Sequence, residues 1–190
     1  MRFVALFAFA LLTSAAQAAT LADARNAWEA RNYAEAFQAA SVVADQDKTG
    51  EALYILSRVH KEGYGVVKRN SEYALELLQQ AVSRGHAPAI GTLGMAYFDG
   101  DGVEKNIETA KQWWLKAAAK GDAVSMYNLA YVYNLVERNY PEAIVWLRRT
   151  IEKGDDEGRK VALLDLATLH ARGQGMPKDM TEAANLTRRA

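Results

Sequence analysis

The chain has 190 residues, of which 50% are hydrophobic and 24% charged, with 23 basic and 23 acidic side chains. These values are ordinary for a globular protein and allow one domain with a substantial core. The balanced charge, without runs of one sign, argues against nucleic-acid binding and against a membrane-docking patch, because both need clustered basic side chains.

The first 18 residues, MRFVALFAFALLTSAAQA, have the anatomy of a secretory signal peptide. Arg2 precedes an apolar run from Phe3 to Leu12, about half as long as a transmembrane helix needs to be. Ala16 and Ala18 stand where a small-x-small cleavage site requires small residues, so we expect cleavage after Ala18. The alternative interpretation is a buried N-terminal helix.

The chain contains no cysteine. It therefore has no disulfide to stabilise a secreted fold, and it has no cysteine on which a bacterial lipoprotein anchor could be built. Together with the expected signal peptide, this favours a soluble protein of the periplasm of a Gram-negative bacterium.

Internal repetition dominates the rest of the chain. Three stretches combine an aromatic ring, a Gly-x-Gly turn, an apolar residue and a lysine: HKEGYGVVK (60–68), YFDGDGVEK (97–105) and HARGQGMPK (170–178). Leu56, Leu93, Leu129 and Leu166 follow one another at the same interval of about 36 residues. A shorter VERNYPEA replaces the Gly-x-Gly turn in the third unit, and ARNYAEA (30–36) resembles it.

The spacing of apolar residues within each unit is helical. In the second unit Ile90, Leu93, Gly94 and Tyr97 lie on one helical face, and Ala110, Trp113, Ala117 and Ala118 lie on one face of the next helix. Asn139 is positioned to cap the helix that contains Pro141. We expect one domain over 19–190, made of helix pairs at about 22–46, 50–85, 86–121, 122–154 and 155–190.

These residues resemble a known family, the Sel-one-like repeat, which is related to the tetratricopeptide repeat. The second unit carries the resemblance most fully, in AIGTLGMAYFDGDGVEK followed by AKQWWLKAAAKG. His60 and His170 depart from the pattern, because they stand where the family has tyrosine. The resemblance implies an all-α, right-handed superhelical solenoid of αα-hairpins that binds other proteins on its inner surface.

The acidic turn at Asp99 and Asp101 could suggest a calcium loop. The equivalent residues in the other units include Arg172 and Gln174, which are poor calcium ligands, and the twelfth position of the loop is Ala110 where an EF-hand has glutamate. We therefore predict an architectural turn without a metal.

Nothing in the sequence indicates a catalytic site. His60, His86 and His170 are too dispersed for a zinc ligand set, and no nucleophile elbow, phosphate-binding loop or dinucleotide fingerprint is present. We predict no cofactor and no enzyme activity. A hydrolase acting on a cell-wall or β-lactam substrate is the less favoured alternative, because the relatives that are associated with β-lactams have disulfide-linked repeats.

The predicted binding surface begins with a second apolar stripe in the third unit. One stripe, Met126, Leu129, Ala130 and Tyr133, is sufficient to pack that helix. By the register of the tetratricopeptide repeat, the second stripe and its equivalents form a concave groove: Tyr54, Arg58, Lys61, Met95, Phe98, Asp99, Val124, Tyr127, Tyr131, Leu135, Thr168 and Arg172. The alternative is that these rings pack between successive helices.

We therefore expect a periplasmic protein–protein interaction module. As an adaptor or regulator it would dock on an envelope complex or on the periplasmic domain of a sensor. As an immunity protein it would neutralise an antibacterial effector, for example a type VI secretion lipase. The sequence does not distinguish these roles, and it leaves the oligomeric state open.

Overall fold

The structure, a computed structural model, describes residues 19–190. Within this range the regular elements are ten α-helices and one π-helical turn, and no strand occurs. This confirms the all-α prediction. The signal peptide predicted for residues 1–18 lies outside the described residues.

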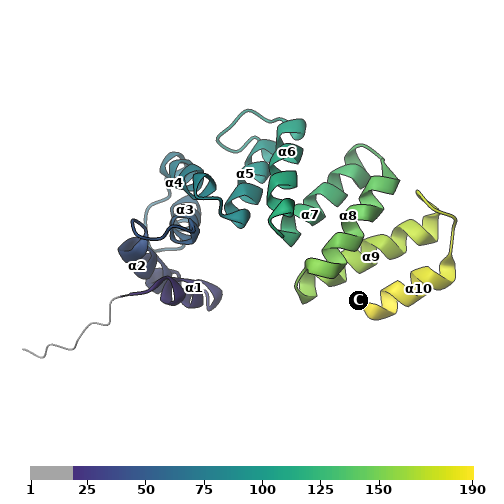
Figure 1. The fold of residues 1–190 in the computed structure, drawn as a ribbon, viewed down its shortest axis with the longest axis horizontal. Helices are drawn as coiled ribbons and strands as arrows, with labels where there is room; N and C mark the ends of the chain where they lie inside the picture. The colour runs from purple at the N-terminus through teal and green to yellow at the C-terminus, as the bar shows by residue number, and fades with distance from the viewer. Residues whose placement is uncertain (1–18) are drawn as a thin grey trace, which may run out of the picture.

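The helices pack as five consecutive pairs, drawn out along an arc in Figure 1. The first helices of the pairs are α1 (Leu21–Glu29), α3 (Glu51–Glu62), α5 (Ala87–Asp99), α7 (Ala123–Tyr131) and α9 (Asp156–Arg172). The second helices are α2 (Tyr33–Val43), α4 (Ser71–Ser83), α6 (Ile107–Ala119), α8 (Tyr140–Lys153) and α10 (Met180–Arg189). The π-helical turn η1 (Val132–Val136) directly follows α7.

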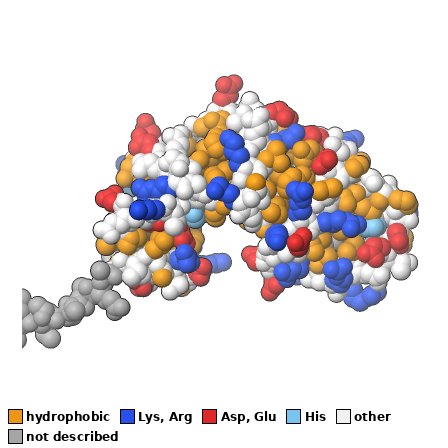
Figure 2. Space-filling view, in the orientation of Figure 1, with side chains coloured by type: hydrophobic (Ala, Val, Ile, Leu, Met, Phe, Trp, Pro, Cys, Tyr) orange, Lys and Arg blue, Asp and Glu red, His pale blue; other side chains and the backbone are white. Residues whose placement is uncertain are grey.

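The first helices line the inner side of the arc. Helix α1 packs against α3, α5 against α7, and α7 against α9, whereas the second helices of successive pairs make no comparable contacts in the described chain. Elements on the inside of a curved array lie closer together than those on the outside, so the first helices form the concave face. Figure 2 shows the resulting arch, hollowed between its N-terminal and C-terminal pairs.

Every second helix begins with the same kind of cap. The N-cap residue is Asn or Asp, and its side chain accepts a hydrogen bond from the backbone N–H three residues further on: Asn32, Asn70, Asn106, Asn139 and Asp179. Such caps satisfy amides that a helix leaves unpaired at its start. The predicted cap at Asn139 is confirmed, with Glu142 as its partner.

Two kinds of turn lead into these caps. In the Gly-x-Gly turns the glycines take positive φ angles, for example 79° at Gly100 and 74° at Gly102, which glycine adopts at little cost. The short turns instead place a non-glycine residue there, with φ of 59° at Arg31 and 57° at Arg138. The sequence resemblance between ARNYAEA and ERNYPEA therefore extends to the backbone.

The tyrosines that follow the two short turns contact equivalent residues of the next unit. Tyr33 stacks on Tyr64, the middle residue of a Gly-x-Gly turn, with ring centroids 3.9 Å apart. The Tyr140 hydroxyl accepts a hydrogen bond from Gln174, the middle residue of another such turn, at 3.0 Å. The same two repeat positions are thus in contact at two places along the arch, which we call the repeated joint.

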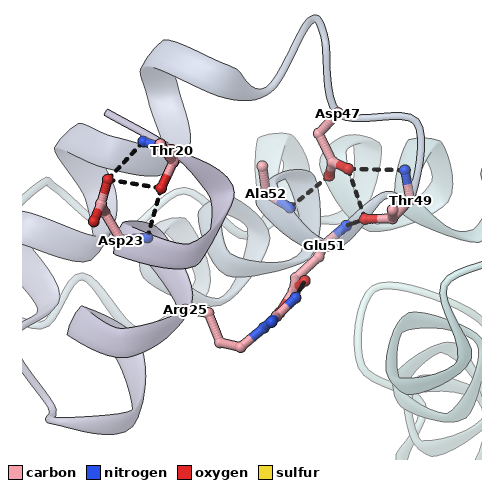
Figure 3. A network of polar contacts seen from close by, with 7 residues as sticks. All are labelled: Thr20, Asp23, Arg25, Asp47, Thr49, Glu51 and Ala52. Atoms are coloured by element: carbon pink, nitrogen blue, oxygen red, sulfur yellow. Dashed lines mark hydrogen bonds and ion pairs between the residues drawn. The ribbon is translucent and has the colours of Figure 1, made fainter. Parts of the chain in front are cut away.

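The loop before α3 is fixed by polar contacts (Figure 3). Gly50 is the N-cap of α3 and has no side chain to offer, so the carboxylate of Asp47 accepts from the amides of Thr49 and Ala52. Burial by itself would raise the pKa of Asp47, but these hydrogen bonds outweigh it and hold the pKa below its ordinary value. Arg25 of α1 makes a paired contact with Glu51, which fastens α1 to α3.

The core consists of two clusters of buried residues. One cluster is built by α1 to α4 with Ala89 and Leu93 of α5, and the other extends from α6 to α10. Tyr97 packs against both. Periodicity identified Trp113 as the packed tryptophan of α6, but Trp114 is the one that is fully buried, at 1% exposure, while Trp113 is half-buried.

Candidate functional site

The two stripes of α7 and η1 differ sharply in exposure. Met126, Leu129 and Ala130 of the packing stripe are 6%, 0% and 1% exposed. In the second stripe Val124, Tyr131 and Leu135 are 67%, 42% and 59% exposed. The second stripe therefore presents apolar side chains to solvent on the inner face, and only Tyr127 is partly covered.

The C-terminal part of the concave face contains a cleft of about 460 Å³, which we call the C-terminal cleft. It lies between α7 with η1 on one side and α9 on the other. Five residues of the predicted groove line it: Tyr127, Tyr131, Leu135, Thr168 and Arg172.

A hydrogen bond crosses the C-terminal cleft between α7 and α9. The Tyr127 hydroxyl donates to the Asp165 carboxylate at 2.9 Å. Burial raises the pKa of Asp165 above its ordinary value, and the hydrogen bond offsets part of that rise. Burial and the neighbouring carboxylate raise the pKa of Tyr127 to about 12, so the hydroxyl stays a donor across the physiological range.

Six residues that line the C-terminal cleft were missed by the sequence reasoning: Asn134, Arg138, Tyr140, Asp165, Leu169 and Gln174. Asp165 stands three residues before Thr168, so the helical spacing could have revealed it. Arg138 and Tyr140 belong to the short turn and the start of α8, and no first-helix register reaches them. Arg138 and Arg172 are exposed, and neither has a carboxylate within 4.0 Å among the described residues.

The N-terminal part of the concave face contains a second cleft of about 340 Å³, the N-terminal cleft. Its lining includes five residues of the predicted groove, from α3, α5 and the start of α7: Tyr54, Arg58, Lys61, Met95 and Val124. The sequence predicted one groove, and the structure distributes its residues over two clefts. A further cavity of about 210 Å³ between the starts of α7 and α9 shares Val124 with the N-terminal cleft and Tyr127 with the C-terminal cleft.

Arg58 is the best-anchored cation of the N-terminal cleft. Its guanidinium donates to the Tyr54 hydroxyl at 3.2 Å and lies 5.7 Å from the centre of the Trp28 ring. Burial by itself would lower the pKa of Arg58, but contacts with Tyr54 and Tyr64 outweigh it and raise the pKa. The side chain is therefore half-buried, charged and held in place.

Phe98 and Asp99 line neither cleft. The Phe98 ring packs between Trp114 and Tyr131, with centroid distances of 5.6 and 6.2 Å, so it supports the exposed stripe from behind. Asp99 is the last residue of α5 and is exposed. The other ten predicted groove residues lie in the two clefts.

The acidic turn has an ionic partner within the chain. The Asp101 carboxylate pairs with Lys61 at 2.5 Å, across the gap between α3 and the turn after α5. Within residues 19–190 no group of three or more His, Asp or Glu side chains is arranged to hold a metal ion. His60, discussed as a ligand candidate, packs edge-on against Phe37 and Tyr73 instead.

None of the helices described for residues 19–190 combines the length and the apolar character that crossing a membrane requires.

The repeat geometry agrees with a comparison to known families. The Sel1 repeat, the family named Sel-one-like above, matches residues 50–86, 90–122, 123–155 and 160–190. The chain belongs to the Sel1 repeat family. This confirms the resemblance inferred from the sequence.

One relative found by sequence and two solved structures resemble this chain, and the three proteins have different names. The chain is 32% identical over 142 residues to the chitin synthase regulator SKT5 of Saccharomyces cerevisiae; the match covers 71% of this chain and 20% of the yeast protein. A Sel1 repeat protein from Oxalobacter formigenes superposes with a TM-score of 0.70 at 28% identity, over 88% of this chain and 68% of that one. The protective antigen c5321 of uropathogenic Escherichia coli gives a TM-score of 0.70 at 28% identity, over 83% and 33%. The two solved structures confirm the predicted solenoid.

Proposed function

We propose that this Sel1 repeat protein is a non-catalytic interaction module of the periplasm, which binds a segment of a partner protein along its concave face. The observation that carries the proposal is the exposed stripe of Val124, Tyr131 and Leu135 beside the C-terminal cleft. As an adaptor or regulator, the protein would act by holding its partner. The periplasmic setting rests on the signal peptide expected at the N-terminus.

The stripe has the chemistry of a protein-binding surface. Leaving large apolar side chains in water costs free energy, and covering them with a partner regains it at about 25 cal/mol per Å². Tyrosine supplies stiff, largely apolar area with a polar tip, which suits interfaces that form and dissociate in water. Support from Phe98 behind Tyr131 keeps that ring in position before binding, so little ordering remains to be done on association.

The arrangement of charges supports binding over catalysis. The C-terminal cleft combines two arginines with one carboxylate that already accepts a hydrogen bond from Tyr127. Such a set can recognise polar groups of a partner, but it offers no activated nucleophile beside a general base. The name of the yeast relative, a regulator of chitin synthase, agrees with a protein that acts by contact.

Photo-crosslinking of residues 19–190 in the periplasm tests this proposal. A photoreactive amino acid at Leu135 on the inner face should crosslink one defined partner, and the same amino acid at Leu115 on α6, which is also exposed, should not. The double variant Tyr127→Ala with Tyr131→Ala should lose the Leu135 crosslink while retaining a cooperative helical melting transition.

Three results would contradict the proposal. Equal crosslinking from Leu115 and Leu135 would show that the inner face has no preference. An unchanged crosslink in the folded double variant would show that the two tyrosines do not contribute to the interface. Turnover of a substrate by the purified chain, abolished by Asp165→Asn, would replace binding by catalysis.

A further inference from the structure

The junction between α3 and α5 is more open than its neighbours. Successive first helices approach each other most extensively at α1–α3, at few positions at α7–α9 and α5–α7, and at fewest at α3–α5. One repeat position contributes to the contrast between the two central junctions. It is occupied by Tyr54 in α3 and by Gly91 in α5, which stand at the same place relative to Leu56 and Leu93.

Glycine at this position lets the next first helix come close. A Cβ atom on Gly91 would lie 2.4 Å from the Ser125 hydroxyl and 2.8 Å from the Asp122 carboxylate, so α7 begins directly against α5. Tyrosine at the same position fills the space between its helices instead. The Tyr54 hydroxyl reaches Thr92 of α5 at 3.3 Å, and its ring lies 5.1 Å from that of His86.

The separation of α3 from α5 produces a crevice that extends from the concave face to the start of α4 and the turn after α5. The N-terminal cleft shares Arg58, Lys61 and Thr92 with a deeper cavity of about 250 Å³. We call the two together the α3–α5 crevice. The surface of this deeper part is mainly apolar, with Ala74, Leu75, Leu78 and Ala96 among its lining residues, and polar side chains such as Ser57, Ser71 and Glu72 complete it.

The deeper cavity has room for a large side chain. An aliphatic cavity of about 150 Å³ is sufficient to take up benzene, and this cavity measures about 250 Å³. A phenylalanine or leucine side chain therefore fits, and burying it removes apolar surface from water on both partners.

Arg58 is the group at the mouth of the crevice that can take up a negative charge. Arg58 is half-buried and has no carboxylate within 4.0 Å among the described residues, while Lys61 is already paired with Asp101. Four carboxylates also line the crevice. Glu62 and Glu72 are exposed, so water and salt screen their charges, whereas Asp101 is paired with Lys61 and Asp122 accepts a hydrogen bond from the Ser125 amide at the start of α7. The half-buried guanidinium acts in a lower dielectric, and a planar fork of donors is suited to a carboxylate.

We propose that the α3–α5 crevice is an anchor site for a partner segment in which a large apolar side chain stands next to a carboxylate. The apolar side chain occupies the deeper cavity and the carboxylate binds Arg58. The proposal rests on the proposed function and names the chemistry of the partner at one end of the concave face.

A titration of isotope-labelled residues 19–190 with short peptides, followed by NMR, tests the anchor site. The probe is N-acetyl-Phe-Asp-amide, and the matched controls are N-acetyl-Phe-Asn-amide and N-acetyl-Ala-Asp-amide. The probe should shift the amide signals of Leu75 and Thr92 and the side-chain N–H signal of Arg58, with saturation in the millimolar range. Each control should bind at least tenfold more weakly, because one lacks the charge and the other the ring.

Two variants separate the charge from the cavity. Arg58→Gln should weaken the Phe-Asp probe about tenfold, to the affinity of the Phe-Asn control, and leave that control unchanged. Arg172→Gln, in the C-terminal cleft, should leave both affinities unchanged. Circular dichroism of both variants shows whether the fold is retained.

Several outcomes would overturn the anchor site. These are equal affinity for the Phe-Asp and Phe-Asn probes, shifts centred on Tyr131 and Arg172, or no saturable shift at Leu75 and Thr92. In each case a crosslink from Leu135 that persists would leave the proposed function standing. Loss of that crosslink together with intact probe binding at Arg58 would reject the proposed function and retain the crevice.

Discussion

The α3–α5 and α5–α7 junctions are built from the same repeat and differ at the inner position that Tyr54 occupies in α3 and Gly91 in α5. Gly91 allows α7 to pack directly on α5, whereas Tyr54 fills the space between α3 and α5 and leaves an apolar cavity behind it. The comparison teaches that the size of an inner side chain contributes to the spacing of neighbouring first helices. It does not set that spacing alone, because Tyr127 occupies the same position in α7 and α7 still packs against α9.

The largest loss of stability is expected at Trp114 of α6, which packs against α5 next to the closed α5–α7 junction. Trp114 is 1% exposed, and its indole N–H donates to the Gly91 carbonyl at 3.0 Å. Trp114→Ala should lower the free energy of unfolding by about 3–5 kcal/mol, because it leaves a large cavity and an unpaired carbonyl. Denaturant unfolding measures this loss. Leu115→Ala, at a position 41% exposed, is the control, and equal losses in the two variants would contradict the assignment.

A smaller loss of stability is expected at Gly91, where α5 and α7 are in contact. Gly91→Ala introduces a methyl group where the Ser125 hydroxyl and the Asp122 carboxylate already lie, and should cost about 1–3 kcal/mol. Adding Ser125→Ala should recover part of that loss, since the closest contact is with its oxygen. A double-mutant cycle without coupling between the two positions would show that α5 and α7 are not in the contact described.

At the open α3–α5 junction, we expect Tyr54→Phe to lower the free energy of unfolding by about 1 kcal/mol. Tyr54→Phe removes the hydroxyl that contacts both Arg58 and Thr92, and a hydrogen bond of this kind contributes about 0.5–1.5 kcal/mol. Thermal unfolding measures the stability of Tyr54→Phe beside that of the control Tyr131→Phe, whose ring is 42% exposed. A loss in Tyr54→Phe no greater than in the control would indicate that the hydroxyl does not hold α3 and α5 in place.

The smallest effect concerns the hydrogen bond across the C-terminal cleft. Because the pKa of Asp165 is raised in the folded chain, its stabilising contribution is full below the ordinary value of about 3.9 and is lost as the pH rises through the raised pKa. Asp165→Asn keeps an oxygen for Tyr127 and does not ionise.

The Asp165→Asn variant should therefore become more stable relative to the wild type as the pH rises from 3.5 to 7, by about 0.5 kcal/mol or less, since the group is half-exposed. Unfolding curves across this range measure the change. A relative loss of stability with rising pH would reverse the assigned pKa direction.

The sequence predicted those features that depend on local spacing. The helix pairs, the exposed stripe of α7 and the cap at Asn139 each follow from residues within a few turns of one another. Repetition strengthened these predictions, because a residue type that recurs at equivalent positions reveals a backbone requirement.

Other features depend on distances between helices, which periodicity does not contain. Positions three and four residues after Ala110 both face inward, so spacing did not choose Trp114 over Trp113. The capping of α3 by Asp47 was missed because its acceptor comes from the preceding loop and not from the N-cap itself. The α3–α5 crevice required the separation of two helices to be known.

The repeated joint of the arch has a consequence for how such proteins vary over evolutionary time. Tyr33 and Tyr140 contact the equivalent residue of the following Gly-x-Gly turn, after short turns of matching backbone, one by ring stacking and the other by a hydrogen bond. Since each pair contacts mainly its neighbours, a whole pair can be inserted or lost while these contacting positions are kept. Duplication would then lengthen the arch in steps of one pair, while the inner side chains stay free to diverge toward new partners.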